Sequence, residues 1–189
     1  MNQDEVLKVF RDSGAFLEGH FLLSSGLHSG QYVQCARLFE NPQVAEKLVK
    51  DLAARVASLQ VDWVIGPAMG GILFAYALAR ELKVRNAFTE RVSGAMTLRR
   101  GFEIPTGSKA LIAEDVLTTG GSALEVARYL ESREVKVMGI TALVDRGGKP
   151  LTYPTYSLLK LKLETATQET CSLCQQGKPV TKPGSRVTA

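Results

Sequence analysis

Short apolar runs alternate with segments of helical period through the middle of this chain, and that alternation limits the folds open to it. The predicted strands are 61–65, 84–88, 109–113 and 135–144, and the predicted helices are 42–58, 72–82 and 120–132. Strands that alternate with helices of about a dozen residues favour a parallel sheet with right-handed crossovers and helices on both faces. The sequence therefore predicts an α/β fold with a central, mostly parallel sheet flanked by helices.

The segments outside this pattern carry weaker signals. A short helix is expected over 6–10, and the alternation of leucine and lysine over 158–163 suggests a half-exposed strand. The stretch 89–108 contains three glycines, a proline and little clear period. Because a compact domain seldom keeps a loop of that length without a use, we predict a mobile lid there. From residue 178 onward we expect an irregular tail.

The length of 189 residues and the 45% hydrophobic content fit one domain with a full core. The apolar runs are too short to cross a bilayer, and the N-terminus lacks the layout of a signal peptide. We therefore expect a cytoplasmic protein without a membrane partner. Three cysteines cannot all pair within one chain, so reduced thiols are predicted.

The net charge of +4 and the pI near 9.0 raise the question of nucleic-acid binding. The basic residues concentrate in two stretches, 91–109 and 178–186, rather than along one helix. A small anionic substrate explains this excess as well as DNA does. We expect no nucleic-acid partner.

The most informative stretch is 111–122, Leu-Ile-Ala-Glu-Asp-Val-Leu-Thr-Thr-Gly-Gly-Ser. An apolar strand delivers the carboxylates of Glu114 and Asp115, and the chain then turns through hydroxyl and glycine residues into a helix. Glycines let backbone N–H groups approach a phosphate, hydroxyls donate further hydrogen bonds, and the helix dipole favours the anion. The two carboxylates can accept hydrogen bonds from sugar hydroxyls or hold water on Mg²⁺.

A simpler account is that the acidic pair ends a strand and 118–122 caps a helix. The combination of apolar strand, acidic pair, Thr-Thr-Gly-Gly-Ser and helix favours a phosphorylated-sugar site instead. Neither common nucleotide signature is present, since the chain has no G-x-x-x-x-G-K-[ST] and no G-x-G-x-x-G.

This stretch resembles the phosphoribosyl-diphosphate (PRPP) motif of the type I phosphoribosyltransferases over all twelve positions. The resemblance implies that Glu114 and Asp115 hold the ribose hydroxyls and that 118–122 wrap the 5-phosphate. The segment 66–71 resembles the diphosphate-binding loop of that family. The implied PRPP-binding residues are Glu114, Asp115, Val116, Leu117, Thr118, Thr119, Gly120, Gly121, Ser122, Met69 and Gly70.

Other segments are similar to the orotate-specific branch of the family. The segment 19–29, followed by Tyr32, resembles the part of that branch that caps the base site, and 143–146 resembles the strand end whose arginine binds the orotate carboxylate. The loop 98–102 and the tail 171–186 are similar to a sub-branch with an L-R-R-G-F loop. The implied orotate-binding residues are Thr118, Arg146 and Tyr32. Residues 1–40 and 150–189 then form a small hood and tail around a core of about 41–149.

The resemblance implies transfer of ribose 5-phosphate from PRPP to orotate, which gives orotidine 5′-monophosphate and diphosphate in pyrimidine biosynthesis. Mg²⁺ is the implied cofactor; it is held mainly by PRPP, through water to Asp115, without a direct protein ligand. The implied catalytic residues are Asp115, Glu114, Arg99, Arg100 and Arg91. The three arginines replace a lid rich in Lys and His in the better-known branch, and each is equally well explained as part of a solvated basic loop. The family also implies a homodimer.

Two departures and two alternatives stand beside this interpretation. Many relatives have lysine where this chain has Ser24 and Gly70. A phosphoribosyltransferase for a purine would keep the PRPP loop and change the base pocket, and a regulator that binds RNA would need a broad basic face.

The tail also carries Cys171-x-x-Cys174. A structural zinc site needs four ligands, and Cys35, His20 and His28 are distant in sequence from this pair. We therefore predict reduced thiols here rather than a metal. His20 and His28 flank Ser24-Ser25-Gly26, and contact with the substrate and an ordinary role as hydrogen-bonded loop histidines are both open to them.

Overall fold

The computed structural model describes residues 1–183. Two predictions extend beyond them: the irregular tail from 178 onward and the family resemblance that continues to Arg186. Their last residues lie outside the described part of the chain.

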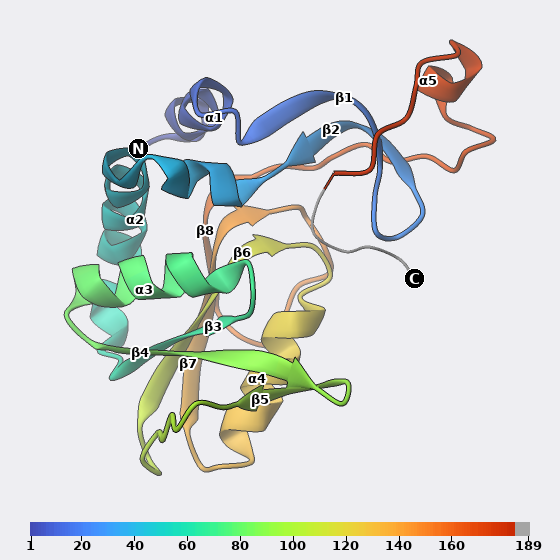
Figure 1. The fold of residues 1–189 in the computed structure, drawn as a ribbon. Helices are drawn as coiled ribbons and strands as arrows, with labels where there is room; N and C mark the ends of the chain where they lie inside the picture. The colour runs from blue at the N-terminus through green and yellow to red at the C-terminus, as the bar shows by residue number, and fades with distance from the viewer. Residues whose placement is uncertain (184–189) are drawn as a thin grey trace.

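A six-stranded sheet in the order β5-β4-β3-β6-β7-β8 forms the centre of the molecule (Figure 1). Every neighbouring pair is parallel except β4 and β5, which are antiparallel. The predicted mostly parallel α/β sheet is thus confirmed. The strands are β3 Trp63–Pro67, β4 Arg85–Val92, β5 Ala95–Leu98, β6 Lys109–Leu117, β7 Lys136–Asp145 and β8 Thr155–Lys160.

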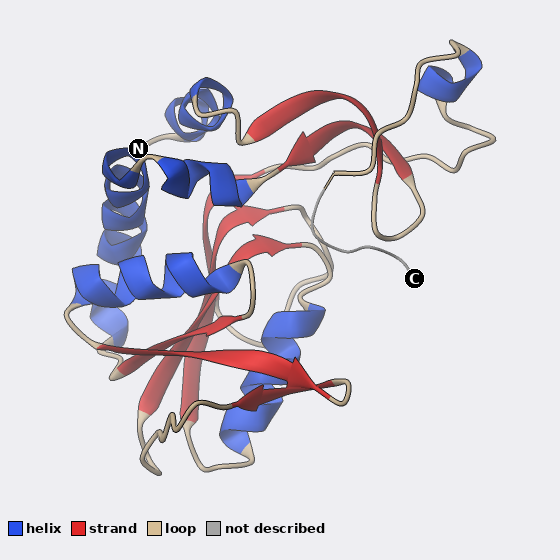
Figure 2. Cartoon of the chain, in the orientation of Figure 1, coloured by secondary structure: helices blue, strands red, loops and turns tan. Residues whose placement is uncertain are grey.

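Helices cover both faces of this sheet (Figure 2). Along β6, Leu111 and Ala113 pack into one core cluster, and Ala110 and Ile112 pack into the other. This alternation follows from the two-residue period of a strand buried on both sides. The first cluster includes residues of α1 (Gln3–Asp12), α2 (Pro42–Val56) and α3 (Gly71–Leu82), and the second those of α4 (Gly121–Glu131). Short 3₁₀ turns, η1 Cys35–Glu40 and η2 Ala57–Leu59, precede and follow α2.

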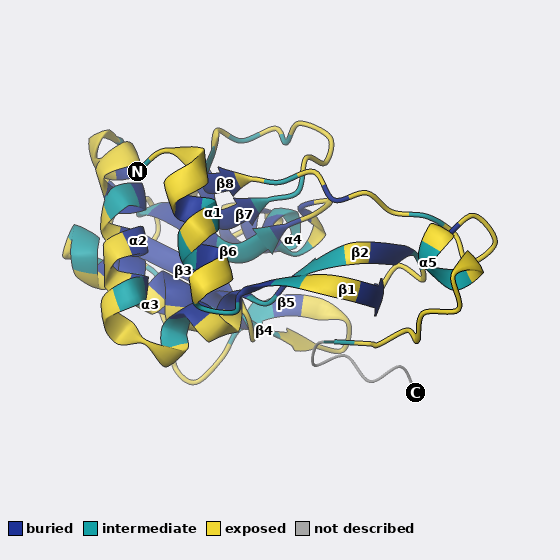
Figure 3. Cartoon of the chain, turned by 90° about the horizontal axis from the view of Figure 1, so that it is seen from above, coloured by how far each residue is buried: buried dark blue, intermediate teal, exposed yellow. Residues whose placement is uncertain are grey.

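A separate hairpin of β1 (Phe16–Leu22) and β2 (His28–Val33) projects from the core toward the short helix α5 (Ser172–Gln175) (Figure 3). The tail runs along both edges of the hairpin. Thr181 exchanges main-chain hydrogen bonds of 2.8 Å with Leu22 and His20 on one edge, and Ala166 exchanges two with His28 on the other. Hairpin and tail therefore form one unit, although well over a hundred residues separate them in sequence.

Four sequence expectations are corrected by this structure. The strand expected to end at Ala113 continues to Leu117, and part of the stretch 89–108 is regular because β4 runs to Val92 and pairs with β5. The β1–β2 hairpin was not predicted from the sequence. In β8, Leu158 and Leu159 are both buried rather than alternating, because α1 and α2 pack on this edge of the sheet. Strand β8, in the range expected for hood and tail, is the edge strand of the central sheet.

Within residues 1–183, no helix has the length and apolar character that a bilayer span requires.

Candidate active site

The loop between β6 and α4 forms a hollow at the carboxyl end of the sheet. The chain turns through Thr118–Gly120 before α4 begins, and Gly120 has a φ of 75° with Leu151 packed against it. No side chain caps this helix, so its first N–H groups are available to an anion. The cavity has a volume of about 260 Å³ and is lined by Arg91, Glu114, Val116, Leu117, Thr118, Thr119, Gly120, Gly121, Ser122 and Glu125.

Asp115 faces the loop that follows β3. Gly70 packs so tightly on it that an added β-carbon would lie 2.5 Å from Asp115 Oδ2. The other carboxylate oxygen, Oδ1, accepts a hydrogen bond of 2.9 Å from the Val116 amide. The peptide bond between Ala68 and Met69 is cis. Because Gly70 packs against Asp115, the two segments predicted to bind PRPP, 66–71 and 114–122, are neighbours in space.

Tyr32 lies within electrostatic reach of both Asp115 and Arg146. Burial raises the pKa of Tyr32, Asp115 raises it further, and Arg146 lowers it. Burial also lowers the pKa of Arg146. The buried Nε of Arg146 has no hydrogen-bond partner among the described residues. A planar carboxylate offers the acceptors that such a guanidinium lacks.

The comparisons with known proteins agree with this geometry. A phosphoribosyl transferase domain model matches residues 35–167. An orotate phosphoribosyltransferase of Caldicellulosiruptor bescii is 48% identical over 188 residues, which cover 98% of this chain and 99% of that protein. This chain belongs to the orotate phosphoribosyltransferase family.

Two solved structures share the fold of the family. The orotate phosphoribosyltransferase of Aeropyrum pernix has a TM-score of 0.71 and 28% identity, over 83% of this chain and 94% of that one. The UMP synthase of Leishmania donovani has a TM-score of 0.73 and 26% identity, over 85% of this chain but only 37% of that longer protein.

The three arginines predicted to lie in a lid have different surroundings. Arg91 lines the cavity and pairs with Glu125 at 2.8 Å, a contact that the sequence analysis did not foresee although Glu125 follows Ser122 by one helical turn. Arg100 binds both carboxylate oxygens of Glu90 at 2.8 Å. Since successive strand residues face opposite sides, Glu90 and Arg100 lie on the opposite side of β4 from Arg91. Arg99 is exposed in the turn after β5.

A larger hollow of about 560 Å³ lies between the segment 98–106 and the end of α4. Its lining includes Ser132 and Val135, which precede β7, so it opens at the amino ends of the parallel strands. Ligands of such sheets bind at the carboxyl ends, and we do not assign the family's reaction to this hollow.

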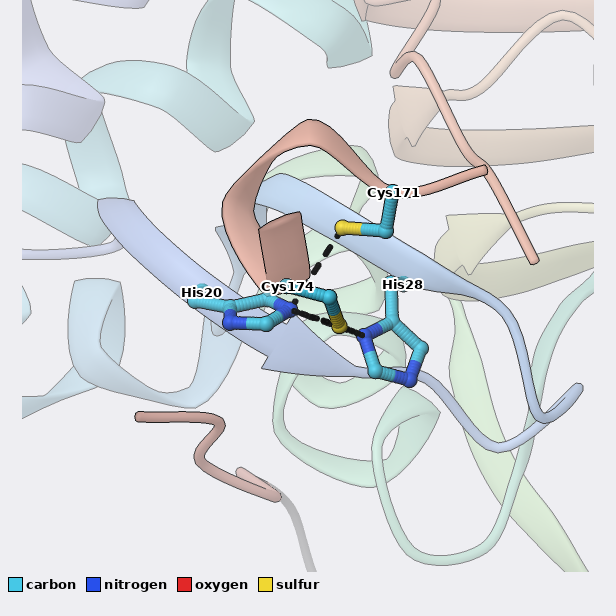
Figure 4. A group of neighbouring side chains, drawn as sticks. All are labelled: His20, His28, Cys171 and Cys174. Carbon is cyan, nitrogen blue, oxygen red and sulfur yellow. Dashed lines mark hydrogen bonds between the residues drawn. The ribbon is translucent and has the colours of Figure 1, made fainter. Parts of the chain in front are cut away.

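The two histidines are distant from the cysteine pair in sequence but lie beside it in the fold. His20, His28, Cys171 and Cys174 converge, with one ligand atom of each within 4.8 Å of the others (Figure 4). The sequence separation gave no sign of this, because the contact depends on how the tail lies along the hairpin. His20 and His28 therefore face the tail cysteines.

Proposed function

We propose that this protein transfers the ribose 5-phosphate group from PRPP to orotate, which gives orotidine 5′-monophosphate and diphosphate. The observation that carries the proposal is the position of Arg146 next to the loop 118–122: its amide donates a hydrogen bond of 2.8 Å to the Leu117 carbonyl, and its buried Nε has no partner among the described residues. This arrangement joins a phosphate-binding helix terminus to a guanidinium with an unpartnered buried nitrogen. A sugar phosphate and a planar carboxylate are the two ligand groups that these features fit.

In this reaction a nitrogen of orotate attacks the anomeric carbon of PRPP and gives up its proton to the departing diphosphate or to solvent, and the C–O bond to diphosphate breaks with its electron pair. The loop 118–122 holds the 5-phosphate, and the carboxylates of Glu114 and Asp115 accept hydrogen bonds from the ribose hydroxyls. Arg146 and Tyr32 orient the base, together with Thr118. Positioning and charge stabilisation supply the catalysis, so no covalent enzyme intermediate is required.

The leaving diphosphate lies by the loop 66–71, where Met69 and Gly70 belong to its binding site. Arg91, which lines the cavity beside the loop 118–122, offers a positive charge. Charge that builds up on the departing oxygens is stabilised most by groups already in place before the bond breaks.

Mg²⁺ fits the donor set of this site. Carboxylate oxygens are the hard ligands that Mg²⁺ prefers, and it retains several waters in sites shared with substrate phosphates. Asp115 would hold the ion through water. When bound, the ion neutralises charge on the diphosphate.

We also propose a homodimer formed across α3 and acting in the cytoplasm. Met69, Leu73 and Tyr76 are 79%, 54% and 60% exposed, and their spacing places them on one side of the helix and its preceding loop. A second copy would cover this apolar surface. The three cysteines are all unpaired, which fits a reducing compartment. Light scattering after gel filtration should give twice the chain mass, and Leu73→Glu with Tyr76→Glu should give the monomer.

The test of the reaction is the loss of orotate absorbance after mixing with PRPP and Mg²⁺, with adenine, guanine, hypoxanthine, xanthine and uracil run in parallel. Turnover of orotate alone is expected, abolished by Asp115→Asn and weakened by Arg146→Ala. Turnover of a purine in place of orotate would contradict the proposal.

A further inference from the structure

The cluster of His20, His28, Cys171 and Cys174 has the composition of a structural zinc site. Two thiolates and two neutral imidazoles are a common tetrahedral zinc ligand set, and two thiolates neutralise the ion. Cys171-x-x-Cys174 supplies one pair from α5 and its N-cap, and the hairpin supplies the other (Figure 4). Among the described residues, this is the one group of three or more His, Cys, Asp or Glu side chains whose ligand atoms lie close enough together to hold a metal ion.

Three of the six distances between ligand atoms match the edges of a zinc tetrahedron, and all six are at most 4.8 Å. His20 Nε2 lies 3.5 Å from Cys171 Sγ and 3.6 Å from Cys174 Sγ, and His28 Nδ1 lies 3.3 Å from Cys174 Sγ. Bonds of about 2.0 Å to nitrogen and 2.3 Å to sulfur place tetrahedral ligand atoms about 3.3 to 3.8 Å apart. The two histidine nitrogens, at 2.8 Å, would separate by about half an ångström around an ion.

A second contact determines the tautomer of His20, that is, which ring nitrogen carries the proton and which can bind a metal. Its Nδ1 lies 2.8 Å from the Lys178 carbonyl oxygen, which can only accept a hydrogen bond. Nδ1 therefore carries the proton, and the lone pair of Nε2 points at His28 and the two sulfurs. Metal-binding histidines are held in this way by a carbonyl or carboxylate behind the ring.

The bulge in β1 brings His20 into the cluster. The strand pairing shifts between Glu18 and Phe21, and His20 and Phe21 are consequently both buried although they are adjacent. A regular strand would turn them to opposite faces. Bulges commonly redirect a side chain in this manner at functional positions.

Apart from the hydrogen bonds that join tail and hairpin, the surroundings of the cluster offer little apolar packing. Neither core cluster contains a residue from 164–183, and α5 has four residues, far fewer than an isolated helix needs. His20, His28 and Cys171 are nevertheless 6%, 6% and 4% exposed. Small units without a core are commonly held by a metal.

We propose that these four side chains bind one Zn²⁺ that fastens the tail to the β1–β2 hairpin. The site is separate from the proposed catalytic chemistry, and its existence does not depend on that function. Tyr32 ends the same hairpin four residues after His28, so the metal also holds in place the element that covers the base site.

The test is the metal content of protein purified without chelator or added metal, measured by inductively coupled plasma mass spectrometry. We expect about one zinc per chain in the wild type, and less than a tenth of that in Cys171→Ser/Cys174→Ser. Cys35→Ala, which removes the third cysteine, should retain the metal. Wild-type protein that neither contains zinc nor takes up added Zn²⁺, or a double variant that keeps it, would overturn the proposal.

Two measurements on the wild type avoid variants that fail to fold. Replacement by Co²⁺ should give the intense visible bands of tetrahedral cobalt with near-ultraviolet thiolate charge transfer, whereas an octahedral spectrum would rule the site out. A chelator should expose two cysteines to a thiol reagent. A mass lower by two hydrogens, the mark of a Cys171–Cys174 disulfide, would also contradict zinc. Cys174→His should keep the ion, because it substitutes one ligand for another.

Discussion

Gly70 lies against the carboxylate of Asp115, so closely that a β-carbon at position 70 would be 2.5 Å from Oδ2. The backbone of Gly70 is in the right-handed helical region, with φ of −59°. Glycine is therefore needed at this position for space rather than for its conformation. The contact joins the predicted diphosphate loop to the predicted ribose-binding acid.

Gly70→Ala should accordingly push the Asp115 carboxylate aside and lower kcat/KM for PRPP by at least about tenfold, because small displacements of a positioning group are costly. The unfolding midpoint should change little, since a side-chain end can shift. Steady-state kinetics at saturating orotate measures the effect. Gly30→Ala is the matched control, as its β-carbon would make ordinary contacts of 3.7 Å or more. Unchanged PRPP kinetics in Gly70→Ala would show that the contact has no catalytic consequence.

Arg146→Lys should weaken orotate binding nearly as much as Arg146→Ala, about 30-fold or more, because an ammonium cannot reproduce a two-pronged guanidinium contact. Competition with uracil, which lacks the carboxylate, provides the internal control. Uracil binding should be almost unaffected by either variant. Equal losses for orotate and uracil would mean that Arg146 acts on the pyrimidine ring or on the fold.

Arg100 should act in the partner subunit if the enzyme is a homodimer, because its ion pair with Glu90 turns it away from the cavity that Arg91 lines. Mixing and refolding inactive Asp115→Asn with Arg100→Ala chains should restore about a quarter of wild-type activity, since half the dimers are mixed and each has one intact site. The pairing of Asp115→Asn with Arg91→Ala is the comparison. This mixture should restore no activity, because Asp115 and Arg91 serve the same site within one subunit. Recovery in neither mixture would place Arg100 in its own subunit's site, and full activity of the Arg100→Ala chains alone would place it outside catalysis.

Asp51 connects the N-terminus to α2 and should make stability depend on pH. Partial burial raises its pKa, but hydrogen bonds from the N-terminal amine and Arg55 outweigh this and lower the pKa below its ordinary value of 3.8. A lowered folded-state pKa means that the carboxylate stabilises the fold above pH 3.8 and loses this contribution as the pH falls through the lowered value. Asp51→Asn should therefore cost at most about 1 kcal/mol at pH 7, since the pair is partly solvated. Urea unfolding should show the gap between variant and wild type closing below pH 3.8; a gap independent of pH would assign the loss to packing.

The β6–loop–α4 unit could be predicted from sequence because every signal for it is local. An apolar run, two acids, a glycine turn and a periodic helix lie within 109–131, and the structure places them as a strand and helix over that range. The hairpin 16–33 could not be found in the same way. Its bulge puts His20 and Phe21 on the buried side together, which breaks the alternation that marks a strand. The tail residues that bind its edges come from 164–181.

The base site was inferred only through family resemblance. Tyr32 lies in β2 of the hairpin, Asp115 lies near the end of β6 and Arg146 follows β7, and no local pattern connects them. The convergence of His20 and His28 with Cys171 and Cys174 is the same kind of long-range contact without a family motif to announce it. The long sequence separation of the histidines from the cysteines therefore gave no indication that the four side chains form a cluster in the folded protein.

The central claim is the transfer of a phosphoribosyl group to orotate, and product analysis tests it most directly. Purified protein with PRPP, Mg²⁺ and orotate would be followed by ³¹P NMR, with the Asp115→Asn variant run alongside. We expect the PRPP signals to be replaced, mole for mole, by inorganic diphosphate and a 5′-monophosphate that matches orotidine 5′-monophosphate. Release of diphosphate with free ribose 5-phosphate alone, or unchanged PRPP, would contradict it.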